Sequence, residues 1–383
     1  EEAIIAGDLH DPNSRVAKLA AREEAQVRRP EQQTGPNVFY LGAEPITLDP
    51  GAAKEPSTYL WSERRLPPPE WPADRPVRED ATTVLNVDHP VHWTWRVDAY
   101  LVTKGIAGGA AMLAWLPQVF GRNDGLSRWG PEAISLVFLT ITMLLLIFDL
   151  KRPQYFFRLL TRPNWSSWLV KGGIILGAFG GCTAAILLAR AAGMDSIANA
   201  LRIPNAFLGL GTAIYTAWLF AQCEGRDLWQ HKSKLAWHLT SQAVFLGAIA
   251  LLPLALLGHQ KDSLIGTMIM LANFGGFWHL AFALQEKEHK ANGSRHDTSN
   301  AHQARLLLNK IPLFESKTLQ NSGFGAFRTG ITVSTIGLVL LDLAKVGGFL
   351  SVPLGALVVL TSVVGLFAYE RAFVRAGQLP PLS

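Results

Sequence analysis

Ionisable side chains interrupt several of the long apolar stretches of this sequence. Asp98 and Lys104 lie within the first stretch, and Asp149 ends the second. A charge inside a membrane is costly, so each of these residues is a candidate for chemistry or proton transfer. Asp98 and Lys104 are six residues apart, which places them on different faces of a helix. Arg152 follows Asp149 at i+3, close enough for the two to pair on a helical turn.

Two histidines and two cysteines are the other residues that suggest a metal or a proton carrier. His238 opens the fifth apolar stretch and His279 lies near the end of the sixth, so both are expected toward the same side of a membrane. A lone histidine near a helix end is an interfacial residue or proton carrier more often than a haem ligand. Cys182 and Cys223 form no CxxC motif for an iron–sulfur cluster, and each is expected to pack. We therefore expect no metal in this protein; if electrons pass through it, the metal centres belong to a partner.

Eight apolar segments must position these side chains. The sequence of 383 residues is 49% hydrophobic and 17% charged, against about 25% charged in a typical soluble domain. A segment of about 20 apolar residues can span the hydrocarbon of a bilayer. Such segments are expected near 97–118, 131–149, 168–189, 204–222, 236–258, 263–283, 327–345 and 350–370. The expected fold is therefore an all-α integral membrane protein, with eight helices in two four-helix bundles.

Paired glycines recur inside these segments, at 108–109, 172–173, 180–181 and 275–276. Small residues let helix backbones approach closely in lipid, where packing rather than hydrophobicity drives association. We expect these pairs to mark close contacts between helices.

The first 95 residues differ from the rest of the sequence. They contain no long apolar run, and five prolines between positions 67 and 76 exclude long helices and favour an extended conformation. Scattered aromatic residues such as Phe39, Trp61 and Trp71 suggest a segment that docks on a partner. We expect residues 1–95 to form an extramembrane, Pro-rich arm, with a disordered tail as the alternative, and residues 96–383 to form the membrane domain.

The net charge of +5 does not indicate a nucleic-acid partner, because the basic residues lie mainly at the ends of apolar segments. Basic residues at these positions set the orientation of a membrane protein. The loops on the side of the two termini hold 15 Lys and Arg residues, and the opposite loops hold 6. The count predicts cytoplasmic termini in a bacterial inner membrane.

Four short motifs stand at the ends of these segments. The first segment opens with H-W-T-W at residues 92–95, followed by Tyr100 and a glycine-rich run at 105–109. The second ends in D-L-K-R-P-Q-Y-F at 149–156, Tyr215 precedes R-D-L-W at 226–229, and the sequence ends with A-G-Q-L-P-P-L-S at 376–383. In order and spacing, these motifs resemble those of the NrfD/polysulfide-reductase membrane-subunit family, over residues from about 90 to 383.

The resemblance implies a function and a site. Members of that family are haem-free, quinone-reactive subunits. They pair with a ferredoxin-like iron–sulfur subunit, and often with a molybdopterin catalytic subunit, at the face of the termini. Their quinone site lies at the same face. By position, Tyr215 matches the tyrosine that hydrogen-bonds a quinone carbonyl, and Asp149 matches an acidic residue of the site. Tyr100 stands where some relatives have a histidine, and His92 belongs to the same motif as the start of the first segment.

The chemistry of quinones agrees with these residue types. Reducing a quinone to a quinol takes two electrons and two protons, so the site needs donors to the carbonyls and titratable groups that lead to water. Tyr215 and Tyr100 can donate, and Asp149 can relay protons. Lys104 or Arg152 could stabilise a developing quinol anion, although Arg152 fits equally well as an anchor to lipid headgroups. The further candidates for proton transfer are Asp98, Lys104, His238 and His279.

The expected function is therefore that of a quinone-binding anchor subunit of a respiratory oxidoreductase, such as a formate dehydrogenase or a polysulfide reductase. It would exchange electrons between an iron–sulfur partner and menaquinone or ubiquinone. A secondary transporter is an alternative, favoured by the paired glycines and by Asp98 and Lys104, although no matching pair of broken helices is evident. A cytochrome b-type subunit with haem between His238 and His279 is another. The sequence leaves open the soluble substrate, the direction of electron flow and proton pumping.

Overall fold

The computed structural model describes residues 93–150, 152–223, 226–257, 262–288, 299–308, 310–311, 323–343 and 351–380. Residues 1–92 lie outside these ranges, and with them His92 and almost all of the expected N-terminal arm. All regular secondary structure in the described residues is helical, which confirms the expected all-α fold.

Among the described residues, eight helices are long and apolar enough to cross a membrane. The first crossing consists of α3 (Trp95–Leu113) and the short α4 (Leu116–Val119). The others are α5 (Gly125–Asp149), α7 (Trp168–Ala191), α8 (Asp195–Ala221), α9 (Lys232–Leu257), α10 (Asp262–Glu288), α12 (Gly323–Leu343) and α13 (Ser351–Gln378). Large apolar residues such as Leu188 and Phe207 point outward, 70% and 71% exposed, as lipid-facing residues do. The eight spans predicted from hydropathy are confirmed.

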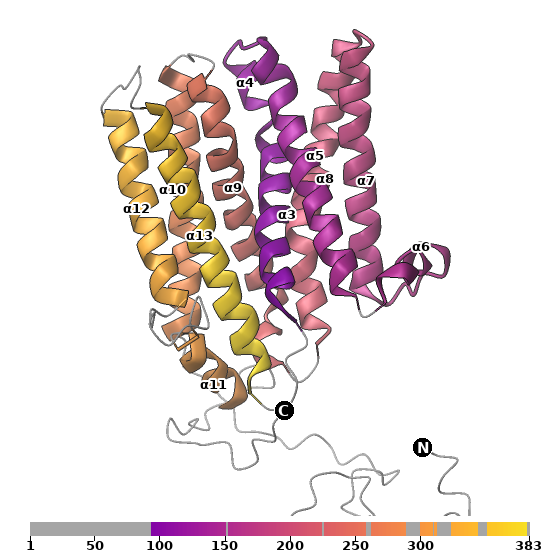
Figure 1. Cartoon of the computed structure of the whole chain (residues 1–383), viewed down its shortest axis with the longest axis vertical. Helices are drawn as coiled ribbons and strands as arrows, with labels where there is room; N and C mark the ends of the chain where they lie inside the picture. Colours follow the sequence, from indigo (N-terminus) through magenta and orange to yellow (C-terminus); the bar gives the residue numbers. More distant parts are fainter. Residues whose placement is uncertain are drawn as a thin grey trace, which may run out of the picture. The chain divides into compact units, whose positions relative to one another are not determined.

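Successive long helices run in opposite directions (Figure 1). The end at which α3 begins and α13 stops is called the terminal end here, and the opposite end the far end. Three short elements lie at the terminal end: α6 (Arg158–Thr161), the 3-10 turn η4 (Asp227–Trp229) and α11 (Ser299–Leu308). A second 3-10 turn, η3 (Pro153–Tyr155), precedes α6.

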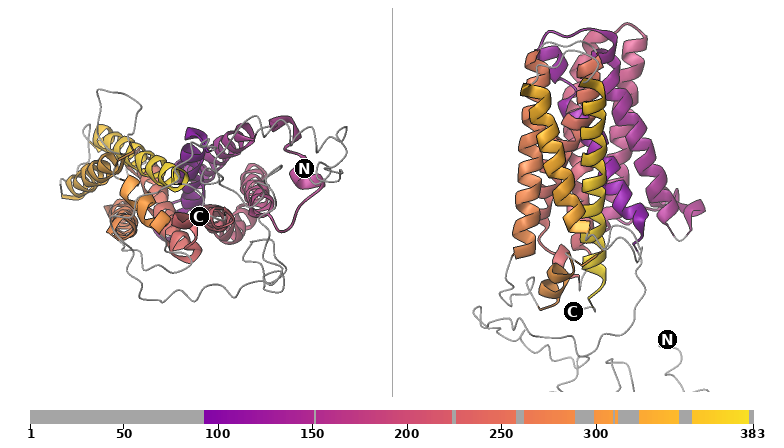
Figure 2. Two further views of the ribbon diagram at one scale, coloured as in Figure 1. Left: turned by 90° about the horizontal axis from the view of Figure 1, so that it is seen from below. Right: turned by 60° about the vertical axis from the view of Figure 1, so that its left-hand side comes forward.

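The long helices form two groups of four, as the sequence predicts. Helices α3, α5, α7 and α8 pack as a first bundle, and α9, α10, α12 and α13 as a second. The view along the helices shows the two groups side by side (Figure 2, left). Helix α3 also contacts α9 and α13, and therefore joins the two bundles.

Glycines of α3 allow it to pack closely against α8 and α9. A Cβ added at Gly108 of α3 would lie 2.5 Å from the carbonyl oxygen of Gly209 on α8. One added at Gly109 would lie 1.9 Å from the carbonyl oxygen of Ala243 on α9. Neighbouring residues of α3 thus pack against two different helices, one in each bundle, at distances that only glycine allows. The predicted role of the pair at 108–109 is confirmed.

At the far end, a glycine ends one helix and an aspartate side chain caps the start of another. Helix α7 stops in a Schellman motif, in which Gly193 adopts φ +73° and the N–H of Met194 donates to the carbonyl of Ala189 at 2.8 Å. Asp124 caps α5 by accepting from the N–H of Ser127 at 3.0 Å. Helices α5 and α8 therefore begin six and nine residues earlier than the apolar segments predicted at 131 and 204.

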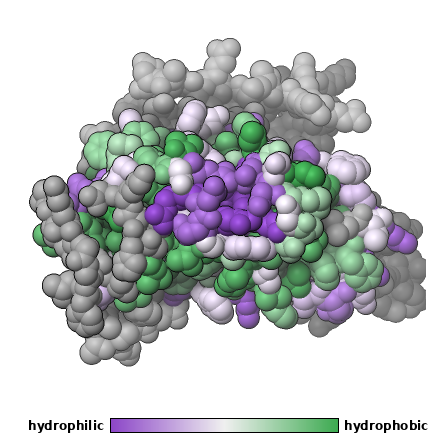
Figure 3. Space-filling model, turned by 90° about the horizontal axis from the view of Figure 1, so that it is seen from above, coloured by the Kyte–Doolittle hydropathy of each residue, from purple (hydrophilic) through white to green (hydrophobic). Residues whose placement is uncertain are grey.

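A buried ion-pair cluster closes the far end of the first bundle. Arg202 of α8 donates to both oxygens of Glu132 on α5, at 2.5 and 3.0 Å, and each side chain is almost fully buried. Arg190 of α7 lies 3.9 Å from the same carboxylate and 3.7 Å from Asp195. Seen from this end, hydrophilic residues gather in the middle of the face, with hydrophobic residues around them (Figure 3). The cluster ties three helices together where the apolar segments end.

Candidate functional site

Lys104 brings two of the predicted site residues together inside the first bundle. It is 1% exposed, and its amino group lies 5.9 Å from the ring centre of Tyr100 and 5.2 Å from that of Tyr215. Tyr100 and Lys104 are one turn apart on α3, and Tyr215 faces them from α8. The amino group donates to the carbonyl of Ala213 at 2.8 Å and to the hydroxyl of Thr216. The lysine is therefore fixed between two phenol rings and the backbone of α8.

The ring of Tyr215 fits between α8 and α7 because α7 carries a glycine, Gly172, opposite it. A Cβ at Gly172 would lie 2.3 Å from Cε2 of the tyrosine ring, so no other residue leaves room for the ring in this position. Leu139 and Phe179 pack in the same apolar cluster. Three helices therefore fix the orientation of Tyr215.

Helix α13 of the second bundle adds a carboxylate that the sequence analysis missed. Glu370 is 3% exposed, and its Oε1 accepts a hydrogen bond from Nε2 of Gln242 on α9 at 2.7 Å. It lies close enough to Lys104 and Asp98 for their charges to interact. The predicted segment ended at 370, which made Glu370 look like an interfacial residue. The helix runs on to Gln378, so Glu370 lies two turns inside it.

Asp98 lies closer to the terminal end than Lys104. It is 1% exposed, and Nη1 of Arg371 lies 3.8 Å from its Oδ2. Asp149, at the end of α5, is near enough to interact electrostatically with Asp98 and accepts a weak hydrogen bond from Thr94 at 3.4 Å. Lys104, Glu370, Asp98 and Asp149 thus form a series of titratable groups that leads from the interior to the terminal end. We call these four residues, with Tyr100 and Tyr215, the central polar cluster.

The expected pairing of Asp149 with Arg152 is wrong. Helix α5 ends at Asp149, and Leu150 is already extended, so Arg152 does not lie on the same helical turn. Arg152 is exposed, whereas Asp149 is partly buried against Thr94. Of the predicted quinone-site residues in the described part of the protein, Tyr100, Tyr215 and Asp149 belong to the central polar cluster and Arg152 does not.

His238 and His279 form a separate cluster in the second bundle. Their ring centres are 4.1 Å apart, and Tyr369 lies 5.2 and 5.0 Å from the two rings. His279 is fully buried and His238 is 6% exposed, so neither is the interfacial residue expected from its place near a helix end. A small cavity of about 20 Å³ beside His238, also lined by Lys234 and Glu286, faces the terminal end. The two imidazoles contact each other directly, whereas the axial ligands of a haem have the macrocycle between them.

Aromatic stacking and the C-terminal residues close the terminal end beside the central polar cluster. Trp93 stacks on Trp229 and Phe220 at centroid distances of 4.8 and 5.0 Å. Gln378 accepts from the N–H of Trp93 at 2.8 Å and donates to its carbonyl at 3.2 Å. Burial raises the pKa of the nearby Cys223 thiol to about 11, so it is neutral at pH 7. The start of α3, η4 and the end of α13 are thereby held together, and they include residues of three of the four sequence motifs.

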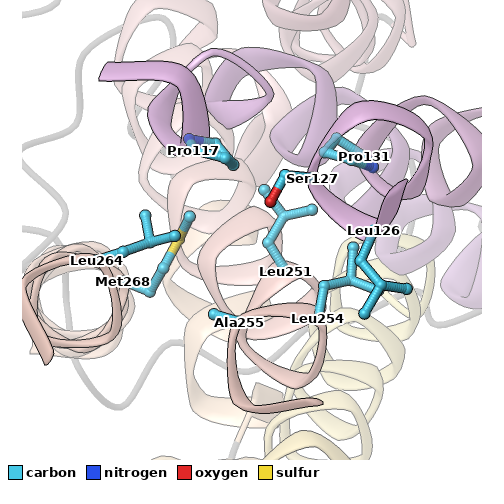
Figure 4. A pocket seen from close by; sticks show the side chains of 9 residues that line it. All are labelled: Pro117, Leu126, Ser127, Pro131, Leu251, Leu254, Ala255, Leu264 and Met268. Atoms are coloured by element: carbon cyan, nitrogen blue, oxygen red, sulfur yellow. The ribbon is translucent and has the colours of Figure 1, made fainter. Parts of the chain in front are cut away.

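Cavities at the far end do not suit a quinone ring. One has a volume of about 10 Å³ and lies among α4, α5, α9 and α10 (Figure 4). Another, of about 410 Å³, lies between α9 and α13, and all of its lining residues are apolar: Pro253, Leu256, Leu257, Gly355, Ala356, Val359, Leu360 and Val363. A binding site needs a few polar groups to orient its ligand. The smaller cavity has only Ser127 and no room for a ring, and the larger cavity has no polar lining residue, whereas the central polar cluster has several polar groups.

Comparison with known proteins identifies the family. The family model described as polysulphide reductase, NrfD, matches residues 83–284, which is more than half of the 383 residues. The C subunit of the polysulfide reductase of Wolinella succinogenes is 34% identical over 94 residues, which make up 23% of this protein and 29% of that subunit. The match to this relative therefore spans less than a third of its length. With eight helices that can cross a bilayer, the protein is a multi-pass membrane protein that belongs to the NrfD polysulphide reductase family.

Proposed function

We propose that this protein is the quinone-reactive membrane subunit of a multisubunit respiratory oxidoreductase. In this role it exchanges electrons between an iron–sulfur subunit and menaquinone or ubiquinone in a bacterial inner membrane. The relative from Wolinella succinogenes is a subunit of a polysulfide reductase by name, which supports a redox complex. A molybdopterin subunit, as in formate dehydrogenases or polysulfide reductases, is the proposed catalytic partner.

The placement of Lys104 is the observation that carries this proposal. An ammonium group and a carboxylate, Glu370, lie inside the helix bundles beside two phenols. Ionisable groups at such depth are costly and mark functional pathways. Phenols, a cation and a carboxylate are also the groups that a quinone requires as it takes up electrons and protons.

Each of these groups has a defined part in the proposed chemistry. The quinone accepts two electrons from the partner and two protons from the protein, and leaves as the quinol. In this proposal the hydroxyl groups of Tyr100 and Tyr215 donate hydrogen bonds to the carbonyl oxygens of the quinone. The ammonium group of Lys104 stabilises the negative charge that develops on the reduced ring.

Protons reach the site from the terminal end. Asp149 is partly exposed at the end of α5, Asp98 lies further inside, and Glu370 and Lys104 lie deepest. Carboxylates in this order can pass protons inward by successive protonation and release. His238 and His279 lie in the second bundle against Tyr369, the residue before Glu370, and remain candidates for the same role.

The partner is proposed to bind at the terminal end, where the motif residues gather. Cytoplasmic termini follow from the distribution of Lys and Arg.

The two alternatives have less support. Direct contact between His238 and His279 does not favour a haem site between them. A secondary transporter would be expected to have helices that unwind near the middle of the membrane, whereas the long helices described here continue through their middle turns.

Replacing the phenol of Tyr215 tests the proposal. Tyr215→Phe keeps the ring against Gly172 but removes the donor, a hydrogen bond worth about 0.5–1.5 kcal/mol. Turnover of the purified complex with a quinone analogue should fall, while reduction of a soluble dye by the partner subunits stays normal. Asp149→Asn should show the same split, because an amide keeps the shape of the carboxylate but carries no proton. Unchanged quinone turnover in both variants would contradict the proposed site.

A further inference from the structure

Basic and aromatic residues that take no part in the proposed quinone site gather in one loop of this protein. Residues 150–171 connect α5 to α7 and form the first turn of α7. They contain five basic residues and no acidic one. We call them the basic aromatic loop, because they also contain Tyr155, Phe156, Phe157, Trp165 and Trp168.

The four basic residues of this loop that the structure describes have no carboxylate partner among the described residues. In the described part of the protein, none of Arg152, Arg158, Arg162 and Lys171 forms an ion pair. Several basic residues elsewhere are paired: Arg128 bonds Asp195, Arg202 bonds Glu132 and Arg305 bonds Glu286. Four cations without a counter-ion on one loop leave a local excess of positive charge. An anionic partner from outside the protein would balance it.

The aromatic side chains of the loop are exposed beside these cations. Trp165 is 63% exposed and Phe157 is 48% exposed. The guanidinium of Arg158 lies 4.3 Å from the ring centre of Tyr155, and the amino group of Lys171 lies 4.6 Å from that of Trp168. Aromatic rings of this kind are enriched where a bilayer meets water. The loop therefore combines two kinds of group that suit the headgroup region.

Hydrogen bonds hold the basic aromatic loop in one position. Gln222, just after α8, accepts from the N–H of Trp168 at 2.6 Å and donates to the carbonyl of Ser166 at 2.8 Å. Asn164 accepts from the N–H of Ser166 at 3.1 Å. These bonds attach the returning half of the loop to the end of α8, so the basic and aromatic groups keep one position relative to the helices.

The position of the loop favours lipid over a protein partner. Helix α6 lies to the side of the first bundle, level with the terminal ends of α5 and α7 (Figure 1), and a second view also shows it projecting outward (Figure 2, right). A protein docked on the terminal end would lie below the helices. A group that projects sideways at the level of the helix ends meets the headgroups around the protein.

We propose that the basic aromatic loop is a binding site for anionic phospholipid, with Arg152, Arg158 and Arg162 contacting the phosphate groups and the exposed rings resting at the acyl boundary. In this proposal Arg152 binds lipid rather than the quinone. It does not depend on the redox reaction, so it can fail or hold independently of the proposed function.

Binding of fluorescent phosphatidylglycerol tests the proposal. The complex, purified in detergent with its associated subunits, is titrated with NBD-labelled phosphatidylglycerol and, as a reference, with NBD-labelled phosphatidylcholine. A basic residue near a charged membrane surface contributes about fivefold in affinity. The triple variant Arg152→Gln, Arg158→Gln, Arg162→Gln should therefore lose roughly a hundredfold in its preference for phosphatidylglycerol. The single variant Arg158→Gln should lose about fivefold.

A matched control removes the same charge elsewhere at the terminal end. Lys232, Lys310 and Arg328 are exposed there, outside the loop, and Lys232→Gln, Lys310→Gln, Arg328→Gln should retain the preference. Equal losses in the two triple variants would mean that only net charge attracts the lipid, and would overturn the proposal. So would an unchanged preference in the loop variant. A loop variant that keeps its lipid preference but releases the associated subunits would instead assign the surface to a protein partner.

Discussion

Lys104 and Glu370 are two buried ionisable residues at the interface between the two bundles. They come from different bundles, α3 and α13, and each has hydrogen-bonding partners of its own: Ala213 and Thr216 for the lysine, Gln242 for the glutamate. Their charges interact across the interface between the bundles. In a medium of low dielectric constant, removing one such charge leaves the other without compensation.

A double-mutant cycle on these two residues is the prediction at this scale. Lys104→Met should lower the thermal midpoint of the complex, because it leaves the buried hydrogen-bonding groups that the lysine satisfies without a partner, at a cost of about 1–3 kcal/mol. Adding Glu370→Gln should restore part of that loss, with a coupling of about 0.5–3 kcal/mol between the two sites. Thermal unfolding in detergent, followed by tryptophan fluorescence, measures both effects.

The control for this cycle is Lys234, which bonds Glu286 at 2.8 Å in the second bundle. Glu370→Gln should not rescue Lys234→Met, because these residues share no partner. If Glu370→Gln gives the same shift in the wild-type and Lys104→Met backgrounds, the two charges do not interact and the argument for a single cluster fails.

At the scale of helices, α3 is the element that every part of the site shares. It carries Asp98, Tyr100 and Lys104, and its neighbouring glycines at 108 and 109 bring α8 and α9 to within backbone contact. Because the contacts involve backbone atoms, they cannot be relieved by a change of rotamer. The distance from Lys104 to Tyr215 is therefore set by glycines more than one helical turn away.

Substitution of single glycines tests this dependence. Gly109→Ala should destabilise the protein by about 1–3 kcal/mol, the usual cost of overpacking, because its Cβ would overlap the carbonyl of Ala243. Gly181→Ala is the matched control, since Gly181 of α7 has nothing within 4 Å of an added Cβ. It should leave the thermal midpoint unchanged or raise it slightly. Equal stability of the two variants would show that the bundles can separate without cost.

Hydropathy was sufficient to predict the eight spans, but it could not predict where the helices end. Of the four glycine pairs expected to mark close contacts, the pair at 108–109 joins the bundles, whereas Gly173 and Gly181 have nothing within 4 Å of an added Cβ. Arg202 lies in a turn that precedes its predicted apolar segment, and Glu132 and Glu370 lie at the edges of theirs. All three are buried because polar or charged groups on neighbouring helices meet them there. The sequence alone does not show which helices are neighbours. For the same reason, Asp149 and Arg152 looked like a pair, whereas the end of α5 separates them.

At the scale of the whole membrane domain, the two ends treat their basic residues differently. At the far end, Arg122 pairs with Asp124, Arg128 with Asp195 and Arg202 with Glu132. At the terminal end, Lys234 and Arg305 pair with Glu286, but Arg152, Arg158, Arg162 and Lys171 of the basic aromatic loop have no carboxylate partner in the described residues. Cytoplasmic loops of membrane proteins carry an excess of Lys and Arg, so this asymmetry predicts the direction of insertion.

Reporter fusions test that direction. Green fluorescent protein fused after Ser383 should fluoresce, because this reporter folds in the cytoplasm, and alkaline phosphatase fused at the same position should be inactive. Gly193 lies in the turn between α7 and α8 at the far end, so phosphatase fused after a truncation at this residue should be active. This fusion serves as the control, since it shares the first three spans. Active phosphatase after Ser383 together with inactive phosphatase after Gly193 would show that the protein inserts in the opposite direction. The partner subunit, the entry of protons at Asp149 and the anionic lipid at the basic aromatic loop would then all belong to the periplasmic side.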